Sequence, residues 1–129
     1  IIAEDLGGNT PEVEKLIKET GFPNMKVLQF AFDSDLNNPF LPKNYDKNCV
    51  CYTGTHDNDT TGGWFLKLSQ KEKNMFSHIV PADESGSPIL SLISFAMKSK
   101  ARIVIIPLQD YLELDSASRL NTPGVPSGN

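Results

Sequence analysis

The chain has 129 residues, of which 39% are hydrophobic and 22% charged, and its formal net charge is -4 at pH 7. This size and composition predict one folded domain. The acidic balance argues against nucleic acid or an anionic membrane as a partner, and no apolar run is long enough to span a bilayer.

The first predicted strand is Ile1-Ile2-Ala3, an apolar run that leads into Glu4-Asp5-Leu6-Gly7-Gly8. A pair of carboxylates between a buried strand and two glycines suits an exposed acid held in a cleft. A single Glu is more commonly a solvated loop residue, so both interpretations stay open.

A packing helix is predicted next, with Pro11 at its first position and Gly21 at its end. Three apolar residues at helical spacing predict its buried face: Val13, Leu16 and Ile17. We assign this helix no chemistry.

Residues 25–32 (MKVLQFAF) predict the second strand, whose alternating aromatic side chains, Phe30 among them, are most simply part of the core. The Pro- and Asn-rich residues 37–45 have no regular period and predict a surface loop. Within it we expect Phe40 and Tyr45 to hold the loop in place rather than to stack on a ligand.

The third predicted strand, Asn48 to Thr53, contains Cys49 and Cys51. Two cysteines at this spacing in a strand are badly placed for a mutual disulfide. We expect both to be buried and reduced, which fits a cytoplasmic protein. No second pair of Cys or His completes a zinc site with them.

The loop from Thr53 to Gly63 (TGTHDNDTTGG) carries one His, two Asp and one Asn directly after this strand. Reactive groups collect at the carboxyl ends of strands in parallel α/β folds. Asp, Asn and Gly are also typical of plain turns, so composition alone leaves a functional loop and a turn equally favoured.

Helices are expected over residues 64–68 and 69–80, and a further helix begins at Pro88. The apolar run from Arg102 to Pro107 predicts a fourth strand that is buried on both faces. Residues 118–129 are polar and have no regular period.

The alternation of strands and helices requires parallel strands joined by right-handed crossovers. Each predicted strand is followed by acids or amides, in the fourth case by Gln109 and Asp110. Four strands that place polar residues on one rim predict half of a (β/α)8 TIM barrel. Because four strands cannot close a barrel, we expect the α/β fold to be incomplete by itself.

Several motifs, taken in order along the chain, resemble those of the amylomaltases, which are 4-alpha-glucanotransferases (disproportionating enzymes) of the alpha-amylase superfamily. The motifs are Ala3-Glu4-Asp5-Leu6-Gly7, residues 25–32, Asn38-Pro39-Phe40-Leu41-Pro42, Asn44-Tyr45, residues 53–61, Ile106-Pro107-Leu108-Gln109-Asp110, Arg119-Leu120-Asn121-Thr122-Pro123-Gly124 and Gly128-Asn129. The resemblance covers essentially the whole chain. It implies that residues 1–129 are the C-terminal part of the catalytic barrel, strands five to eight.

The resemblance also implies roles for particular residues. Glu4 matches the general acid/base, and Asp57 matches the carboxylate that stabilises the transition state. His56 matches a contact to the sugar ring, Phe30 a residue at the substrate subsites and Asn121 a contact to glucan. The implied reaction moves an alpha-1,4-glucan segment to the 4-hydroxyl of an acceptor sugar with retention, and it requires no metal or organic cofactor.

The nucleophile of this family, an Asp in an Arg-x-Asp setting, matches no stretch of the sequence, since Arg102 is followed by Ile-Val. We therefore expect a chain that lacks the N-terminal half of its barrel and is inactive alone. The bare edges of an open sheet predict that such a chain self-associates or rearranges its strands.

Two other hypotheses remain open. Carboxylates and one imidazole could form the divalent-metal site of a hydrolase from Asp5, His56, Asp57 and Asp59, although no recurrent ligand spacing supports it. The chain could also be a non-enzymatic half-barrel that binds glucan or another protein, which glucan binding without turnover would mark.

Overall fold

Three parallel strands in sequence order form the sheet in the computed structural model of the chain, which describes residues 1–7, 10–33 and 35–126. The strands are β1 (Asn24–Val27), β2 (Cys49–Tyr52) and β3 (Ile103–Ile105). In the register of the sheet, Val50 of β2 lies opposite Met25 of β1 and Ile103 of β3. This arrangement confirms the predicted parallel α/β fold.

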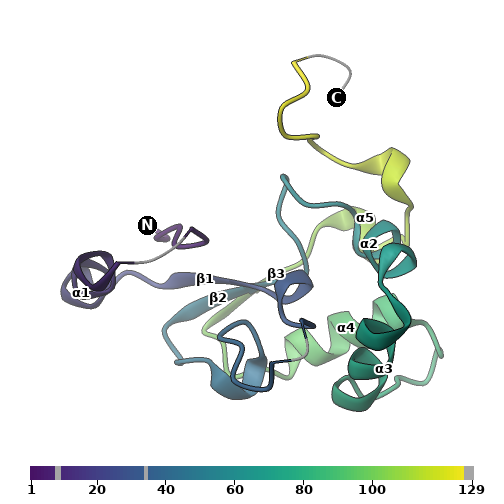
Figure 1. Cartoon of the computed structure of the whole chain (residues 1–129), viewed down its shortest axis with the longest axis horizontal. Coiled ribbons are helices and arrows are strands. Elements are labelled where there is room, and N and C mark those ends of the chain that lie inside the picture. Colours follow the sequence, from purple (N-terminus) through teal and green to yellow (C-terminus); the bar gives the residue numbers. More distant parts are fainter. Residues whose placement is uncertain (8–9, 34, 127–129) are drawn as a thin grey trace.

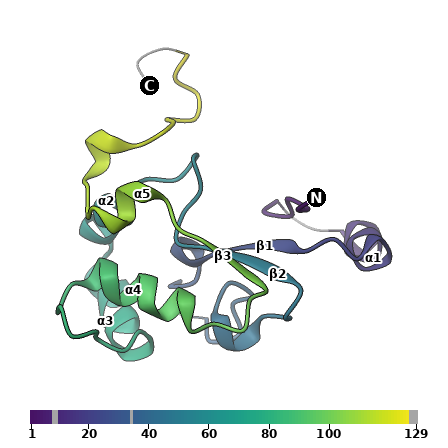
Figure 2. The same ribbon diagram turned by 180° about the vertical axis from the view of Figure 1, so that it is seen from behind.

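Helices lie before, between and after the strands, four of them where helices were predicted and the last one in a segment for which no helix was predicted. They are α1 (Pro11–Thr20), α2 (Thr61–Lys67), α3 (Gln70–Ile79), α4 (Pro88–Met97) and α5 (Leu108–Tyr111). Figures 1 and 2 show α2, α3 and α4 gathered at one end of the sheet and α1 at the opposite end. In the described part of the chain, no helix combines the length and the apolar character that crossing a membrane requires.

The hydrophobic core lies between β2 and the helices α3 and α4. Its fully or nearly fully buried members include Leu28, Phe32, Leu41, Cys49, Cys51, Phe76, Val80, Leu92 and Ala96. Both cysteines are free and buried, as predicted. Burial raises the pKa of the Cys51 thiol to about 11, because the thiolate would lose its hydration inside the core.

The first two predicted strands are shorter in the structure than in the prediction. Residues 1–3 contribute only an isolated parallel bridge, in which Ala3 pairs with Asn24. The second strand ends at Val27 because residues 28–30 form a 3-10 helix, in which Gln29 N donates to Thr53 O at 3.2 Å. The backbone therefore turns beside the end of β2 instead of continuing as a strand.

The predicted burial of β3 on both faces is wrong. Val104 packs against the core, but Ile103 and Ile105, on the other face, are each 41% exposed. The predicted packing face of α1 is likewise open, with Leu16 59% exposed and no buried residue in the helix. Both corrections have one cause, because no described element covers these surfaces.

Residues 37–45 are more ordered and more buried than a surface loop. Residues 42–44 form a 3-10 helix, and Leu41 and Tyr45 are each only 1% exposed. The hydroxyl of Tyr45 donates to the carbonyl of Phe40 at 2.8 Å, so Tyr45 holds this segment in place, as predicted. Gly8, which ends the first predicted loop, and the Gly128-Asn129 motif lie outside the described residues.

Candidate functional site

The loop that joins β2 to α2 and ends on the first residue of α2, residues 53–61, carries His56 and Asp57 at its tip. An internal turn shapes this tip, because the side-chain oxygen of Asn58 accepts hydrogen bonds from the backbone N of Thr55 at 2.9 Å and from its hydroxyl at 2.7 Å. The side chains of His56 and Asp57 are 70% and 53% exposed, so both are open to a ligand.

Asp57 is the centre of a cluster that joins this loop to the C-terminal segment. The side-chain amide of Asn121 donates to one carboxylate oxygen of Asp57 at 2.5 Å, and Nε2 of His56 lies 3.4 Å from the other. The guanidinium of Arg119 donates to the carbonyl of Asp57 at 3.0 Å and to the carbonyl of Asn121 at 3.2 Å. The structure thus brings together three of the predicted site residues, His56, Asp57 and Asn121.

Asp59 anchors the same loop to its neighbours. Its carboxylate accepts from Lys67 Nζ at 2.5 Å and from Ser116 Oγ at 2.8 Å, and its carbonyl accepts from the side chain of Gln29 at 2.9 Å. Burial alone would raise the pKa of the Asp59 carboxyl, but the bonds from Lys67 and Ser116 and the charge of Lys67 lower it below its usual value.

Both ends of the loop are hydrogen-bonded to Asp110, a residue that the sequence suggested would lie on the rim of the sheet. Its carboxylate is instead buried, at 1% exposure, and accepts hydrogen bonds from Thr53 and Thr61. The sequence signals for Asp110 were its position after a strand and its place in the motif Ile106-Pro107-Leu108-Gln109-Asp110, and neither distinguished an exposed acid from a buried one.

Among the described residues, the hydrogen bonds and the ion pair of the Asp57 cluster do not include Glu4 or Phe30. Glu4 is exposed and comes one residue after the bridge of Ala3 with Asn24, so it stands near the start of β1 rather than beyond the end of β2. Phe30 is 40% exposed and packs edge-to-face against Phe40, with the ring centroids 5.4 Å apart.

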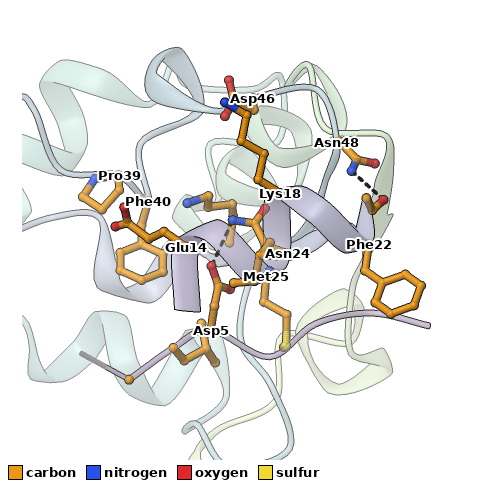
Figure 3. Close-up of a pocket in the computed structure, with 15 residues that line it drawn as sticks. Asp5, Glu14, Lys18, Phe22, Asn24, Met25, Pro39, Phe40, Asp46 and Asn48 are labelled. Carbon is orange, nitrogen blue, oxygen red and sulfur yellow. Dashed lines mark hydrogen bonds between the residues drawn. The ribbon is translucent and has the colours of Figure 1, made fainter. Parts of the chain in front are cut away.

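A separate cleft of about 840 Å³ lies between α1, the N-terminal segment, the start of β1 and the segment around Phe40 (Figure 3). On one wall Asp5 accepts hydrogen bonds from the side chain of Asn24 at 2.9 Å and from the backbone N of Met25 at 3.0 Å. Among the described residues that line this cleft, Asp5 belongs to the metal-site hypothesis, and none is a residue to which the family resemblance gives a role. We therefore place the candidate site at the Asp57 cluster.

The metal-site alternative finds no support in the geometry. Within the described residues, no three or more His, Cys, Asp or Glu side chains are placed to hold a metal ion. Of its four proposed ligands, Asp5 and Asp59 are instead bound to other protein groups, at opposite ends of the sheet.

Comparisons with known proteins agree on one family. All of residues 1–129 match the family described as 4-alpha-glucanotransferase. A 4-alpha-glucanotransferase from Synechocystis sp. is 52% identical over 100% of this chain and 26% of its own length. A chloroplastic/amyloplastic 4-alpha-glucanotransferase from Solanum tuberosum is 50% identical over 100% of this chain and 22% of its own length.

A solved structure agrees with these sequence matches. An amylomaltase from Streptococcus agalactiae in complex with acarbose superposes with a TM-score of 0.95 and 32% identity, over 99% of this chain and 26% of that one. The chain thus spans about a quarter of the length of the relatives that it matches.

Proposed function

Because the chain belongs to the 4-alpha-glucanotransferase family, we propose that its parent protein transfers alpha-1,4-glucan segments to the 4-hydroxyl of an acceptor sugar. The observation that carries this proposal is the cluster of His56, Asp57 and Asn121 at the open tip of the loop after β2. Acarbose in the related amylomaltase supports a sugar ligand here.

We place residues 1–129 in the C-terminal half of a (β/α)8 barrel, as strands five to eight. The segment around Ala3 and the strands β1, β2 and β3 would be these four strands, in an order that the parallel sheet supports. The other half of the barrel, with the nucleophilic Asp, would come from the rest of the parent protein.

The proposed chemistry is a retaining double displacement. Glu4 gives its proton to the oxygen of the leaving sugar while the nucleophile forms the glycosyl-enzyme bond, and then takes a proton from the attacking acceptor hydroxyl. Asp57 stabilises the positive charge that develops on the sugar ring. Its partners Asn121 and His56 already hold its carboxylate in one orientation, which lowers the cost of reorganisation in the transition state.

Substitution of the two carboxylates in the full-length parent tests these roles. We expect Glu4→Gln to lower the disproportionation of maltotriose by about 10²- to 10⁴-fold, because the leaving oxygen then has no proton donor. Asp57→Asn should lower it by about 10²- to 10³-fold, because the ring charge loses its stabilising carboxylate. Glu84→Gln and Asp83→Asn, the same chemical changes in the turn before α4, should leave the rate near the parental value.

The outcomes separate the parts of the proposal. Near-parental transfer by Glu4→Gln or Asp57→Asn would contradict the role of that residue, and a parent that transfers no glucan would contradict the function itself. The 129-residue chain alone should show no transfer, because no residue in it matches the nucleophile. Glucan binding without turnover by a full-length parent would instead favour the non-enzymatic alternative.

A further inference from the structure

A single buried carboxylate connects both ends of the loop that carries His56 and Asp57. One oxygen of Asp110 accepts from the hydroxyls of Thr53 at 2.6 Å and Thr61 at 2.7 Å, and the other accepts from the backbone N of Thr61 at 2.7 Å. Thr53 follows β2, and Thr61 is the first residue of α2. Asp110 therefore sets the distance between the points where the loop leaves the sheet and enters the helix.

The environment of Asp110 makes this connection rigid. Asp110, Thr53 and Thr61 are each at most 1% exposed, so water does not compete for these hydrogen bonds. Hydrogen bonds to an ionised carboxylate are about twice as strong as those between neutral groups. Because α5 directly follows β3, the carboxylate also ties the loop after β2 to the next strand of the sheet.

We propose that Asp110 is a positioning residue, which places His56 and Asp57 for the transfer reaction without touching substrate itself. The inference rests on the proposed function. The tip of the loop is exposed and has its own internal turn, so its location depends on how its two ends are held. Gln29 also holds the loop, because its backbone N donates to the carbonyl of Thr53 and its side chain donates to the carbonyl of Asp59. Asp110 is the described side chain whose hydrogen bonds reach both Thr53 and Thr61.

Asp110→Asn tests the proposal with almost no change of shape. An amide offers one acceptor oxygen and an NH2 group, so it cannot accept from all three donors at once, and it lacks the charge. The Thr53 and Thr61 hydroxyls must rotate or move away, and the loop ends shift. A misplacement of about 1 Å in a group that acts on the transition state costs up to about a hundredfold in rate.

The experiment uses the full-length parent and two readouts. We expect Asp110→Asn to lower kcat and kcat/KM for maltotriose together, by about tenfold to a hundredfold per folded enzyme, because the lost interaction acts in the transition state. Hydrogen–deuterium exchange of residues 53–61 should become faster, and exchange in α3 should stay unchanged. Asp83→Asn is the matched control and should alter neither readout.

Two further variants keep the test decisive if Asp110→Asn does not fold. Thr53→Val and Thr61→Val each remove one hydroxyl and keep the carboxylate, and each should show a smaller effect in the same direction. Parental kcat per folded enzyme in these variants would overturn the proposal, even if their thermal stability fell. Were the parent to transfer no glucan, the proposed function would fail, while the exchange rates would still decide whether Asp110 holds the loop.

Discussion

At Gly63, an ideal Cβ atom would lie 2.2 Å from Oγ of Ser116 and 2.7 Å from Oδ1 of Asp59. Gly63 is the third residue of α2, where any side chain would enter the contact between the loop and the segment that follows α5. The need for glycine here arises from a close approach of two side chains, since the backbone φ of Gly63 is not in the left-handed region.

Gly63→Ala should therefore destabilise the protein by about 1–3 kcal/mol, the usual cost of forcing an extra carbon into a packed site. Alanine favours a helix by up to about 1 kcal/mol over glycine, so the sign of the change shows which effect is larger. Urea unfolding of the parent measures it. Gly7→Ala is the control and should change the stability little, because a Cβ atom there would meet nothing within 4 Å beyond its chain neighbours. A stabilised Gly63→Ala variant would show that Ser116 and Asp59 move aside at low cost.

At the scale of elements, the loop of residues 53–61 is attached to the rest of the fold by hydrogen bonds at three places. Its ends are bound to Asp110, its Asp59 is bound to Lys67 of α2 and Ser116, and its tip is bound to the C-terminal segment through Asn121. Figure 1 shows this C-terminal segment rising beside the loop, away from α3 and α4. The candidate site is thus built where elements meet, and each attachment can be weakened separately.

The stabilisation that the bonds of Asp59 contribute should decrease in acid. The folded-state pKa of Asp59 lies below the usual pKa of an Asp carboxyl, so its bonds contribute fully above that usual pKa and are lost as the pH falls through the lower folded-state pKa. The free energy of unfolding should differ between the parent and Asp59→Asn by a constant amount near neutral pH. In urea unfolding at a series of acidic pH values this difference should shrink, and a difference that grows with acidity would contradict the assignment.

For the whole molecule, the open surfaces are the dominant feature. The exposed large apolar side chains include Ile1, Val13, Leu16, Ile103 and Ile105, which lie on the N-terminal segment, on α1 and on one face of β3. Buried apolar surface is worth about 25 cal/mol per Å², so several hundred Å² left in water is comparable with the stability of a small domain, about 5–15 kcal/mol. In the proposed barrel the missing half would cover these surfaces.

We therefore expect the isolated 129-residue chain to self-associate. Analytical ultracentrifugation at micromolar concentration should show dimers or larger species, because pairing buries the open face and edges of the sheet. Replacement of Ile103 and Ile105 by Thr should shift the equilibrium toward monomer. Leu66→Thr is the control, because Leu66 is 73% exposed on α2, away from the sheet face. A well-folded monomer with the strands in their present order would contradict the prediction.

The candidate site could be predicted only in part. His56, Asp57 and Asn121 come from motifs of the resembling family, and the structure brings them into one cluster. Arg119 donates to the carbonyls of Asp57 and Asn121. It lies in the same family-like motif as Asn121, but its bond to Asp57 spans 62 residues of sequence, so no local pattern indicated this contact. The roles of all five predicted site residues stay predictions, and Glu4 and Phe30 also lie outside the hydrogen bonds of this cluster.

The sequence by itself determined the features that depend on near neighbours. Pro11 and Gly21 bound α1, Pro88 begins α4 and the apolar run around Val50 forms the central strand, because capping, backbone restriction and strand preference act within a few residues. Only the tertiary structure decided how deeply Asp110 and Ile103 are buried. Asp110 is buried where Thr53 and Thr61 provide three hydrogen-bond donors to its carboxylate. Ile103 stays exposed to water because no described element covers its face of the sheet. Both outcomes depend on segments that are far away in the sequence.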